Sequence, residues 1–174
     1  MQTDQALHTE RLRLRDLRAD DAPRIADLAN DLDVARMTTR IAHPYALSDA
    51  EDFIAHQERY RGDGRAFAIE HPADGLMGVV GLSLTAEQRF PVAGYWLGRP
   101  YWGKGFATEA LAGALSWARR GLGARAVAAD HFVDNPASAW VLTKAGFLYT
   151  GEVVRRRSSG RGAEVLSRKM IWLA

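Results

Sequence analysis

The 174-residue chain contains no cysteine and no long apolar segment. The absence of cysteine excludes disulfide bonds, thiolate catalysis and cysteine-bound metals, and it is typical of a cytoplasmic protein. No apolar run approaches the ~20 residues that a membrane-spanning helix needs. The first residues carry neither a basic flank nor an apolar stretch, so we expect no signal peptide. The histidines show no metal-ligand spacing, and we expect no metal site.

The chain also lacks a large excess of charge of one sign. The 23 lysines and arginines are nearly balanced by 21 aspartates and glutamates, which gives a net charge of +2 at pH 7. This balance is too mild to indicate a nucleic-acid-binding protein. Hydrophobic residues make up 47% of the sequence, enough for a buried core. The length suits one domain that spans residues 1–174.

Hydrophobic periodicity predicts strands and helices in alternation. The expected strands cover residues 9–16, 66–70, 76–84, 95–97, 126–129, 147–154 and 165–172. The expected helices begin at Asp20 or Asp21, at Ser48, near Ala107 and at Asn135. The first of them is expected to extend to Leu32, and the second to begin with a capping box formed by Ser48 and Glu51. This order of elements predicts a mixed α/β sheet with helices on both faces.

The segment from residue 94 to residue 110 organises the rest of the chain. Residues 95–97 form an aromatic and aliphatic run that suits a buried strand, and Gly103 and Gly105 flank Lys104 in a turn. From Ala107 onwards, apolar residues recur with the spacing of one helix face. The first N–H groups of a helix have no intrahelical partner, and glycine lets a ligand approach the backbone closely. The turn is therefore suited to hold phosphate.

Three interpretations of this turn compete. Gly98-x-x-x-x-Gly103-Lys104 is close to a Walker A loop, but Gly105 stands where that motif needs a hydroxyl to bind magnesium. Gly103 and Gly105 also match the glycines of the pyrophosphate loop of GNAT acetyltransferases, although Pro100 replaces the usual Gln or Arg. The third interpretation is a tight turn that enters a packed helix and binds nothing. A second motif is needed to choose among them.

That second motif lies between residues 135 and 147. Asn135-x-x-Ser138, followed by a helical pattern that ends in Gly146-Phe147, resembles the GNAT superfamily and, within it, the RimJ/RimL-like branch. This branch typically carries Tyr-Trp, then Trp-Gly-x-Gly-x-Ala-Thr-Glu-Ala, as residues 95–110 do. The opening Thr-Glu-Arg-Leu-Arg-Leu-Arg of residues 9–15 is typical as well. The order of elements agrees along nearly the whole chain.

The resemblance implies a single-domain GNAT-like fold, with a central, mostly antiparallel sheet and one splayed parallel pair at residues 95–97 and 126–130. It also implies an N-acetyltransferase that uses acetyl-CoA, with the pantetheine arm in the gap and the pyrophosphate on backbone N–H groups of residues 102–108. Arg99, Lys104 and Lys144 are cations that could reach the phosphates. The residues expected to bind the cofactor are Trp96, Leu97, Trp102, Gly103, Lys104, Gly105, Phe106, Ala107, Thr108, Asn135 and Ser138.

The chemistry that the resemblance implies is direct attack of a neutral amine on the thioester. A backbone N–H near Trp96 is the candidate donor to the oxyanion. Ser138 is the candidate catalytic donor to the departing sulfur, because Leu142 stands where much of the superfamily has a tyrosine. Val92 stands where many relatives carry a glutamate base.

The general base must therefore come from elsewhere. His131, which titrates in the useful range, is the candidate for this catalytic role. Glu109 and Asp134 are further candidates, although Glu109 also suits the start of its helix. An amine that is already partly neutral would need no dedicated base.

Three functional hypotheses remain open. The first is an N-acetyltransferase that acts on a primary amine of a small molecule or of a protein N-terminus. The second is an acyl-CoA-binding module with little or no catalysis, motivated by Leu142, Val92 and Pro100. The third is a P-loop nucleotide hydrolase. We expect the loops at residues 36–45 and 85–91 to shape the acceptor site, and the protein to be a monomer or a homodimer.

Overall fold

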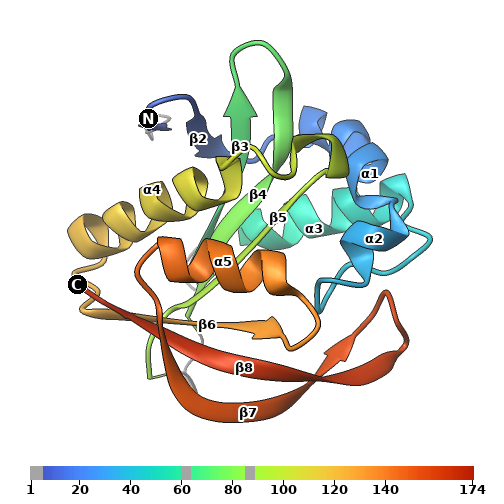
Figure 1. Cartoon of the computed structure of the whole chain (residues 1–174). Coiled ribbons are helices and arrows are strands. Elements are labelled where there is room, and N and C mark those ends of the chain that lie inside the picture. Colours follow the sequence, from blue (N-terminus) through green and yellow to red (C-terminus); the bar gives the residue numbers. More distant parts are fainter. Residues whose placement is uncertain (1–5, 60–63, 85–88) are drawn as a thin grey trace.

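The computed structural model describes residues 6–59, 64–84 and 89–174. Its centre is an eight-stranded sheet in the order β1-β2-β3-β4-β5-β6-β8-β7 (Figure 1). The strands are β1 (Leu7–His8), β2 (Arg13–Asp16), β3 (Gly64–His71), β4 (Gly75–Ser83), β5 (Val92–Leu97), β6 (Ala126–Phe132), β7 (Leu148–Ser158) and β8 (Ala163–Leu173). The helices are α1 (Ala22–Ala29), α2 (Leu32–Ala35), α3 (Leu47–Arg59), α4 (Phe106–Gly121) and α5 (Pro136–Lys144), with 3-10 turns at Ala19–Asp21 and Arg99–Tyr101.

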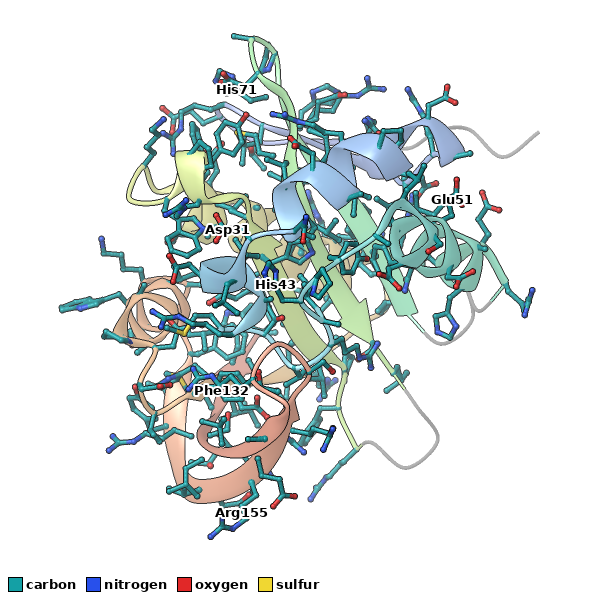
Figure 2. The ribbon with its side chains drawn as sticks, turned by 90° about the vertical axis from the view of Figure 1, so that its right-hand side faces the viewer. Asp31, His43, Glu51, His71, Phe132 and Arg155 are labelled. Atoms are coloured by element: carbon teal, nitrogen blue, oxygen red, sulfur yellow. The ribbon has the colours of Figure 1, made fainter. Side chains whose placement is uncertain are left out.

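The sheet is antiparallel except between β5 and β6, which run parallel. Seen from the side, α1 and α3 lie on one face of the sheet, and α4 and α5 lie on the other (Figure 2). The predicted mixed sheet with helices on both faces is therefore confirmed. Because both faces are covered, β4 is buried almost continuously from Leu76 to Val80 rather than alternately.

Helix α4 packs on the sheet through the face that its periodicity predicts. Its buried residues are Phe106, Ala110, Leu111, Ala114, Leu115 and Ala118. Small alanines alternate with leucines, which lets the helix lie close to β4 and β5. The start of α4 is thus held firmly against the end of β5, and this fixes the turn between them.

The alternating arginines near the N-terminus are not all on a solvent face. Leu12 and Leu14 are buried as predicted, but Arg15 is buried as well. Its guanidinium binds the carboxylate of Asp21 through two hydrogen bonds of 2.8 Å, and its Nε binds Glu70 at 3.0 Å. Such a buried ion pair fixes the segment before α1, since removal of one partner would strand a buried charge.

The first predicted helix is divided in two. Helix α1 ends at Ala29, and α2 begins at Leu32, which is half exposed. The division arises because the Asp31 carboxylate accepts a hydrogen bond from the Asp33 N–H at 2.8 Å and caps a new helix. The continuous helix to Leu32 was therefore a wrong prediction.

The capping box predicted from Ser48 and Glu51 is also wrong. Helix α3 begins one residue before Ser48, at Leu47. The carboxylate of Asp49 accepts a hydrogen bond from the Ala46 N–H at 2.7 Å. Asp49 thus provides the reciprocal contact that the sequence pattern assigned to Glu51.

Several strands are longer than the apolar pattern predicts. Strand β5 begins three residues early, at Val92, and β6 continues to Phe132. Strands β7 and β8 form a long hairpin in which Arg155 pairs with Leu166 and Arg157 with Glu164. Ladder hydrogen bonds hold these exposed residues in strands even though they bury little apolar surface. Of the loop expected at residues 85–91, positions 85–88 lie outside the described residues.

Candidate active site

Strands β5 and β6 are paired over a short distance. Val92 is the register partner of Ala128, and the Ala128 N–H donates to the Pro91 carbonyl oxygen at 2.8 Å. Among the described residues this is where the parallel ladder stops, so the strands separate beyond Ala128. The predicted splayed pair at residues 95–97 and 126–130 is confirmed. A gap between strands leaves backbone groups for a ligand to satisfy.

The hydrogen-bond pattern shows which groups of β5 face this gap. The Gly98 N–H donates to the Met77 carbonyl oxygen of β4 at 2.9 Å. Along an antiparallel strand, every second residue hydrogen-bonds to the same neighbouring strand. The N–H of Trp96 therefore points to β4, as that of Gly98 does. Tyr95 and Leu97 therefore turn their N–H groups towards β6. The N–H groups of Tyr95 and Leu97 are therefore better placed than that of Trp96 to be the expected backbone donor to the oxyanion.

The two tryptophans predicted to bind the cofactor have different surroundings. Trp96 packs against Val34 and Ile41, on the face covered by the first helices. Trp102 is 42% exposed, and its indole N–H donates to the Leu97 carbonyl oxygen at 2.8 Å. That hydrogen bond ties the glycine turn to the end of β5, next to the gap.

The turn before α4 has the geometry of an anion-binding loop. Gly103 and Gly105 adopt positive φ angles of 74° and 80°. A Cβ atom on Gly103 would meet nothing within 4 Å, so the space above the turn is open. The first N–H groups of the 16-residue helix α4, from Phe106 to Thr108, point out of the helix start with the positive end of its dipole. The side chain of Phe106 is buried, so its backbone N–H is the part available to a ligand.

The N-terminal segment clamps this loop. Arg11 donates from Nε to the Glu109 carboxylate at 2.7 Å and from Nη1 to the Lys104 carbonyl oxygen at 3.0 Å. Its guanidinium also lies 4.5 Å from the centre of the Phe106 ring. Thr9 donates to the same carboxylate at 2.6 Å. The opening segment of the chain and the Ala-Thr-Glu-Ala segment therefore meet at one point, beneath the turn.

These contacts determine the protonation of the Glu109 carboxyl group. Burial alone would raise the pKa of its carboxyl group, but the hydrogen bonds from Thr9 and Arg11 outweigh burial and hold the pKa below its usual value. A carboxylate committed to three donors is a poor proton acceptor. Glu109 serves to hold the loop, and the geometry does not favour it as the general base.

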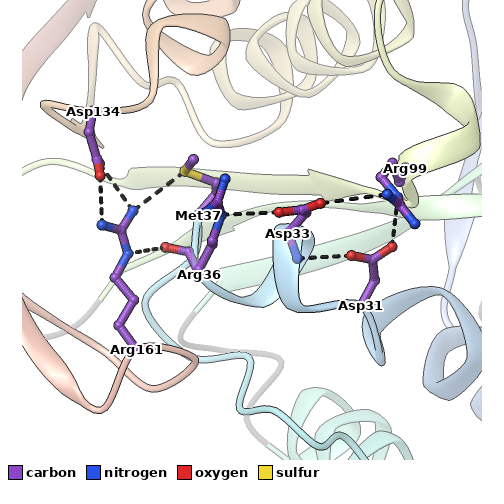
Figure 3. A network of polar contacts seen from close by, with 7 residues as sticks. All are labelled: Asp31, Asp33, Arg36, Met37, Arg99, Asp134 and Arg161. Carbon is purple, nitrogen blue, oxygen red and sulfur yellow. Dashed lines mark hydrogen bonds and ion pairs between the residues drawn. The ribbon is translucent and has the colours of Figure 1, made fainter.

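The three cations expected near the phosphates differ in their surroundings. Arg99 is bound to Asp31 at 2.9 Å and to Asp33 at 3.5 Å, so it braces α2 (Figure 3). Lys104 is exposed between the two glycines of the turn. Lys144 is exposed in the last turn of α5. Of the three, Lys104 is placed at the candidate phosphate site by the backbone itself.

Asn135 and Ser138 occupy the start of α5. The Asn135 side chain accepts a hydrogen bond from the Ser138 N–H at 3.1 Å, which confirms Asn135 as the helix cap. The Ser138 hydroxyl lies 2.8 Å from the hydroxyl of Tyr95. Leu142 is fully buried one turn later. The position that carries a tyrosine in much of the superfamily is thus part of the core here.

Tyr95 is the functional candidate that the sequence did not reveal. It lies on β5, yet its hydroxyl crosses to the first turn of α5 and meets Ser138. Burial raises the pKa of this phenol, and the hydrogen bond with Ser138 opposes that rise only in part. Tyr95 therefore stays protonated as a hydrogen-bond donor. An aromatic residue in a strand pattern carries no local signal of such a contact.

His131 lies at the end of β6 and is buried. Its Nδ1 lies 2.8 Å from the Phe132 carbonyl oxygen, and its Nε2 lies 3.0 Å from the Tyr149 hydroxyl. Since a carbonyl only accepts, Nδ1 donates to Phe132, and in the neutral imidazole Nε2 accepts from Tyr149. Both nitrogens are therefore occupied. Any substrate proton would reach His131 through the Tyr149 hydroxyl, not directly.

Asp134 is held by the β7–β8 hairpin. Arg161 donates to both of its carboxylate oxygens, at 2.7 and 3.0 Å, and these bonds hold the pKa of Asp134 below its usual value. The same guanidinium donates to the Arg36 carbonyl oxygen at 2.6 Å and contacts the Met37 sulfur (Figure 3). This arrangement makes Asp134 part of a brace and does not favour it as a base.

An open cleft of about 900 Å³ lies on the face of the sheet covered by the first helices. Its walls are residues 37–42, α3 and the hairpin strand β7, and it reaches Tyr95 and Ser138 at the gap. The acid of β6 that lines it, Asp130, already binds Arg156 at 2.8 Å and Ser167 at 3.2 Å. Of the loops expected to shape the acceptor site, residues 37–42 and Tyr45 line this cleft.

Residues 6–59, 64–84 and 89–174 contain neither a metal-binding cluster nor a membrane-spanning helix. No group of three or more histidine, aspartate or glutamate side chains is placed to hold a metal ion there. None of the helices seen there is both long enough and apolar enough to cross a membrane.

The phosphate-type loop, the splayed strands and the cleft together define a known class of enzyme. A family model described as an acetyltransferase (GNAT) domain matches residues 11–148. The chain therefore belongs to the GNAT family of acetyltransferases, whose acyl donor is acetyl-CoA. The predicted family and the predicted acyltransferase are confirmed, and the P-loop hydrolase was a wrong interpretation.

Known proteins agree with this assignment. Uncharacterized N-acetyltransferase YoaA of Bacillus subtilis (strain 168) is 30% identical over 150 residues, which cover 83% of this chain and 84% of the relative. RimJ of Mycobacterium smegmatis, solved in complex with CoA-disulfide, has a TM-score of 0.84 at 20% identity and covers 99% of this chain and 88% of its own. Spermidine N-acetyltransferase of Vibrio cholerae, solved with CoA and spermine, has a TM-score of 0.79 at 22% identity over 94% of this chain and 95% of its own.

Proposed function

We propose that this protein transfers the acetyl group of acetyl-CoA to a primary amine by direct attack, and that its natural acceptor is an α-amine, such as a protein N-terminus. The observation that carries the proposal is the gap between β5 and β6. The end of β5 beside it is tied to the glycine turn by the Trp102–Leu97 hydrogen bond, and the 900 Å³ cleft reaches it at Tyr95 and Ser138. A donor and an acceptor that enter from opposite sides would meet beside Tyr95 and Ser138.

Each part of the donor site has a role in this proposal. Backbone N–H groups of residues 103–108 hold the pyrophosphate, and Lys104 screens its charge; the N–H of Trp102 is already bound to the Arg99 carbonyl oxygen. The N–H groups of Tyr95 and Leu97 that face the gap bind the pantetheine arm and stabilise the oxyanion. Ser138 donates a hydrogen bond to the departing sulfur, and Asn135 holds the Ser138 backbone in place.

The choice of an α-amine rests on the general bases of the site. Glu109, Asp130 and Asp134 are bound to arginines, and both nitrogens of His131 are occupied. With these four groups engaged, an acceptor that arrives with its amine already neutral is favoured; the other acids that line the cleft, Asp49 and Asp52, lie on α3. At neutral pH an α-amine, with a pKa near ~8, is neutral in a substantial fraction of molecules, whereas a lysine amine, with a pKa near ~10.4, is almost wholly charged.

The donor site is tested by calorimetric titration with acetyl-CoA. Gly103→Val places a side chain in the open space above the turn, and Gly75→Val is its control. Both glycines have positive φ, 74° and 70°, and neither Cβ would meet an atom within 4 Å. Both variants therefore carry the same backbone strain, but we expect only Gly103→Val to lose acetyl-CoA binding.

A folded Gly103→Val variant that binds acetyl-CoA like the parent would remove the glycine turn from the proposal. Circular dichroism checks that both variants are folded. Binding by the parent without release of CoA in the presence of any amine would instead favour an acyl-CoA-binding module. A role for His131 as base stays a prediction, and unchanged turnover of His131→Ala across pH would remove it.

A further inference from the structure

The pair formed by Tyr95 and Ser138 joins two elements that bound the gap from opposite sides. Tyr95 projects from β5, and Ser138 lies in the first turn of α5, 43 residues further along the chain. The two hydroxyl oxygens are 2.8 Å apart. The phenol oxygen also lies 3.3 Å from the Ser138 carbonyl oxygen. Tyr95 is mostly buried, so this contact is the polar environment of its hydroxyl.

The two hydroxyl protons can be arranged in two ways. In the first, Ser138 donates to Tyr95, and Tyr95 donates to the Ser138 carbonyl oxygen. Both protons are then consumed within the pair. In the second, Tyr95 donates to the Ser138 hydroxyl oxygen at 2.8 Å, the shorter of the two distances. The proton of Ser138 is then free to turn into the gap.

We propose that Tyr95 is a positioning residue for acetyl transfer, and that its hydroxyl donates to Ser138 so that the Ser138 proton points at the departing sulfur. This inference rests on the proposed function. Tyr95 acts through Ser138 and does not need to touch the reacting atoms. The Ser138 backbone is already fixed by Asn135, so the orientation of the hydroxyl proton is the remaining freedom.

The reaction balances without a proton leaving the pair. The nitrogen of the neutral amine forms a bond to the thioester carbonyl carbon, and the carbon–sulfur bond breaks with its electron pair on sulfur. Ser138 donates a hydrogen bond to the developing thiolate and keeps its proton. The surplus proton of the acylated nitrogen passes to water, and CoA takes up a proton from water after release. A free thiol has a pKa near ~8.5, so a positioned hydrogen bond suffices to assist this leaving group.

The burial of Tyr95 favours a role as a hydrogen-bond donor that keeps its proton, not as a general acid that gives its proton up. A phenolate at this position would lie in a poorly solvated site, and burial raises the pKa of the group. A phenol that keeps its proton polarises the Ser138 hydroxyl and does not titrate in the pH range in which acetyl transfer is measured. The expected signature is therefore a change in the rate of acetyl transfer with little change in its pH dependence.

The test is a double-mutant cycle on Tyr95→Phe and Ser138→Ala, with acetyl-CoA binding and single-turnover acetyl transfer measured for each variant. Phenylalanine keeps the ring in place and removes the hydroxyl. We expect each single variant to lower the transfer rate about three- to tenfold, the worth of one hydrogen bond. The double variant should be no slower than Ser138→Ala, because Tyr95 acts through the serine. The acetyl-CoA Kd should stay within about twofold of the parent.

Tyr101→Phe is the matched control. Tyr101 is buried, and its hydroxyl accepts a hydrogen bond from Arg24 at 2.6 Å, away from Ser138. It should transfer acetyl groups at the parent rate. Thermal unfolding of every variant separates lost structure from lost chemistry.

Two outcomes would overturn the role of Tyr95 alone: a parent-like rate in Tyr95→Phe, or equal and independent losses in the two single variants that multiply in the double variant. A parent protein that binds no acetyl-CoA, or acetylates no amine, would overturn the proposed function itself. The two failures are distinguished by the parent measurements.

Discussion

Single residues in this protein often serve two elements at once. Glu109 belongs to the first turn of α4, where a negative charge complements the helix dipole. Its carboxylate also accepts hydrogen bonds from Thr9 and from the backbone and side chain of Arg11. The glycine turn that we propose as the phosphate site is therefore stabilised by the segment between β1 and β2.

Replacement of this carboxylate should show a defined pH dependence. The folded-state pKa of Glu109 lies below its usual value, so its contribution to stability is present above the unfolded-state pKa of ~4.3 and is lost as pH falls through the folded-state value. We expect Glu109→Gln to be about 1–3 kcal/mol less stable than the parent at pH 7. Urea unfolding at several pH values measures this difference, which should shrink below about pH 4. A difference that stays constant between pH 7 and pH 3 would contradict the assignment.

At the level of elements, the cleft wall is assembled from pieces that are short on their own. Helix α2 has four residues and could not persist in isolation. Arg99 holds its start through Asp31 and Asp33, and Arg161 of the hairpin holds its end through the Arg36 carbonyl oxygen (Figure 3). The hairpin tip is docked there too, because the Ser159 N–H donates to the Thr39 carbonyl oxygen at 3.0 Å.

Loss of the Arg161 contacts should therefore weaken binding of the amine acceptor and leave binding of acetyl-CoA unchanged. We expect Arg161→Ala to raise the KM for the amine several-fold, since residues 37–42 lose one support, and to leave the acetyl-CoA Kd unchanged. Arg155→Ala is the control, because Arg155 is an exposed arginine on the same hairpin. Steady-state kinetics and calorimetry measure the two quantities. A change in acetyl-CoA affinity without a change in KM would show that this wall does not belong to the acceptor site.

In the proposed function, the two substrates approach the gap from opposite faces of the sheet. Helices α4 and α5 lie on one face of the sheet, and α1 and α3 lie on the other (Figure 2). The cleft is lined by α3 and residues 37–42 and reaches the start of α5 at Ser138. Glu109, Asp130 and Asp134 are bound to arginines, so in the proposed function none of these three takes the proton of the acceptor. The selection of the amine is then a consequence of the amine's own pKa.

We expect the enzyme to prefer an α-amine to a lysine amine, and two matched peptides test this preference. One peptide has a free N-terminus and a blocked lysine, and the other has an acetylated N-terminus and a free lysine. We expect the first to have a kcat/KM at least about tenfold higher at pH 7.5, because its amine is far more often neutral. The advantage should narrow as pH rises towards 10. Faster acetylation of the lysine peptide, or of spermidine, at pH 7.5 would contradict the α-amine proposal.

The sequence by itself determined the features that depend on neighbouring residues. The inner face of α4 follows from apolar spacing, and Asn135 caps α5 through the N–H of Ser138, three residues away. The glycine turn follows from Gly103 and Gly105, because both need a positive φ that other residues avoid. These local signals, with the resemblance that they carry, were enough to predict the family, and they support the donor site that we propose.

The tertiary structure alone decided which side chains meet across the fold. Tyr95 and Ser138 are 43 residues apart, and Arg11 and Glu109 are 98 residues apart. No local pattern encodes such contacts, because they depend on how strands and helices are placed in space. His131 has both nitrogens occupied for the same reason, since Tyr149 reaches it from a strand that lies two places away in the sheet. Periodicity within the chain thus predicts the elements, and packing between them determines which groups are free to act.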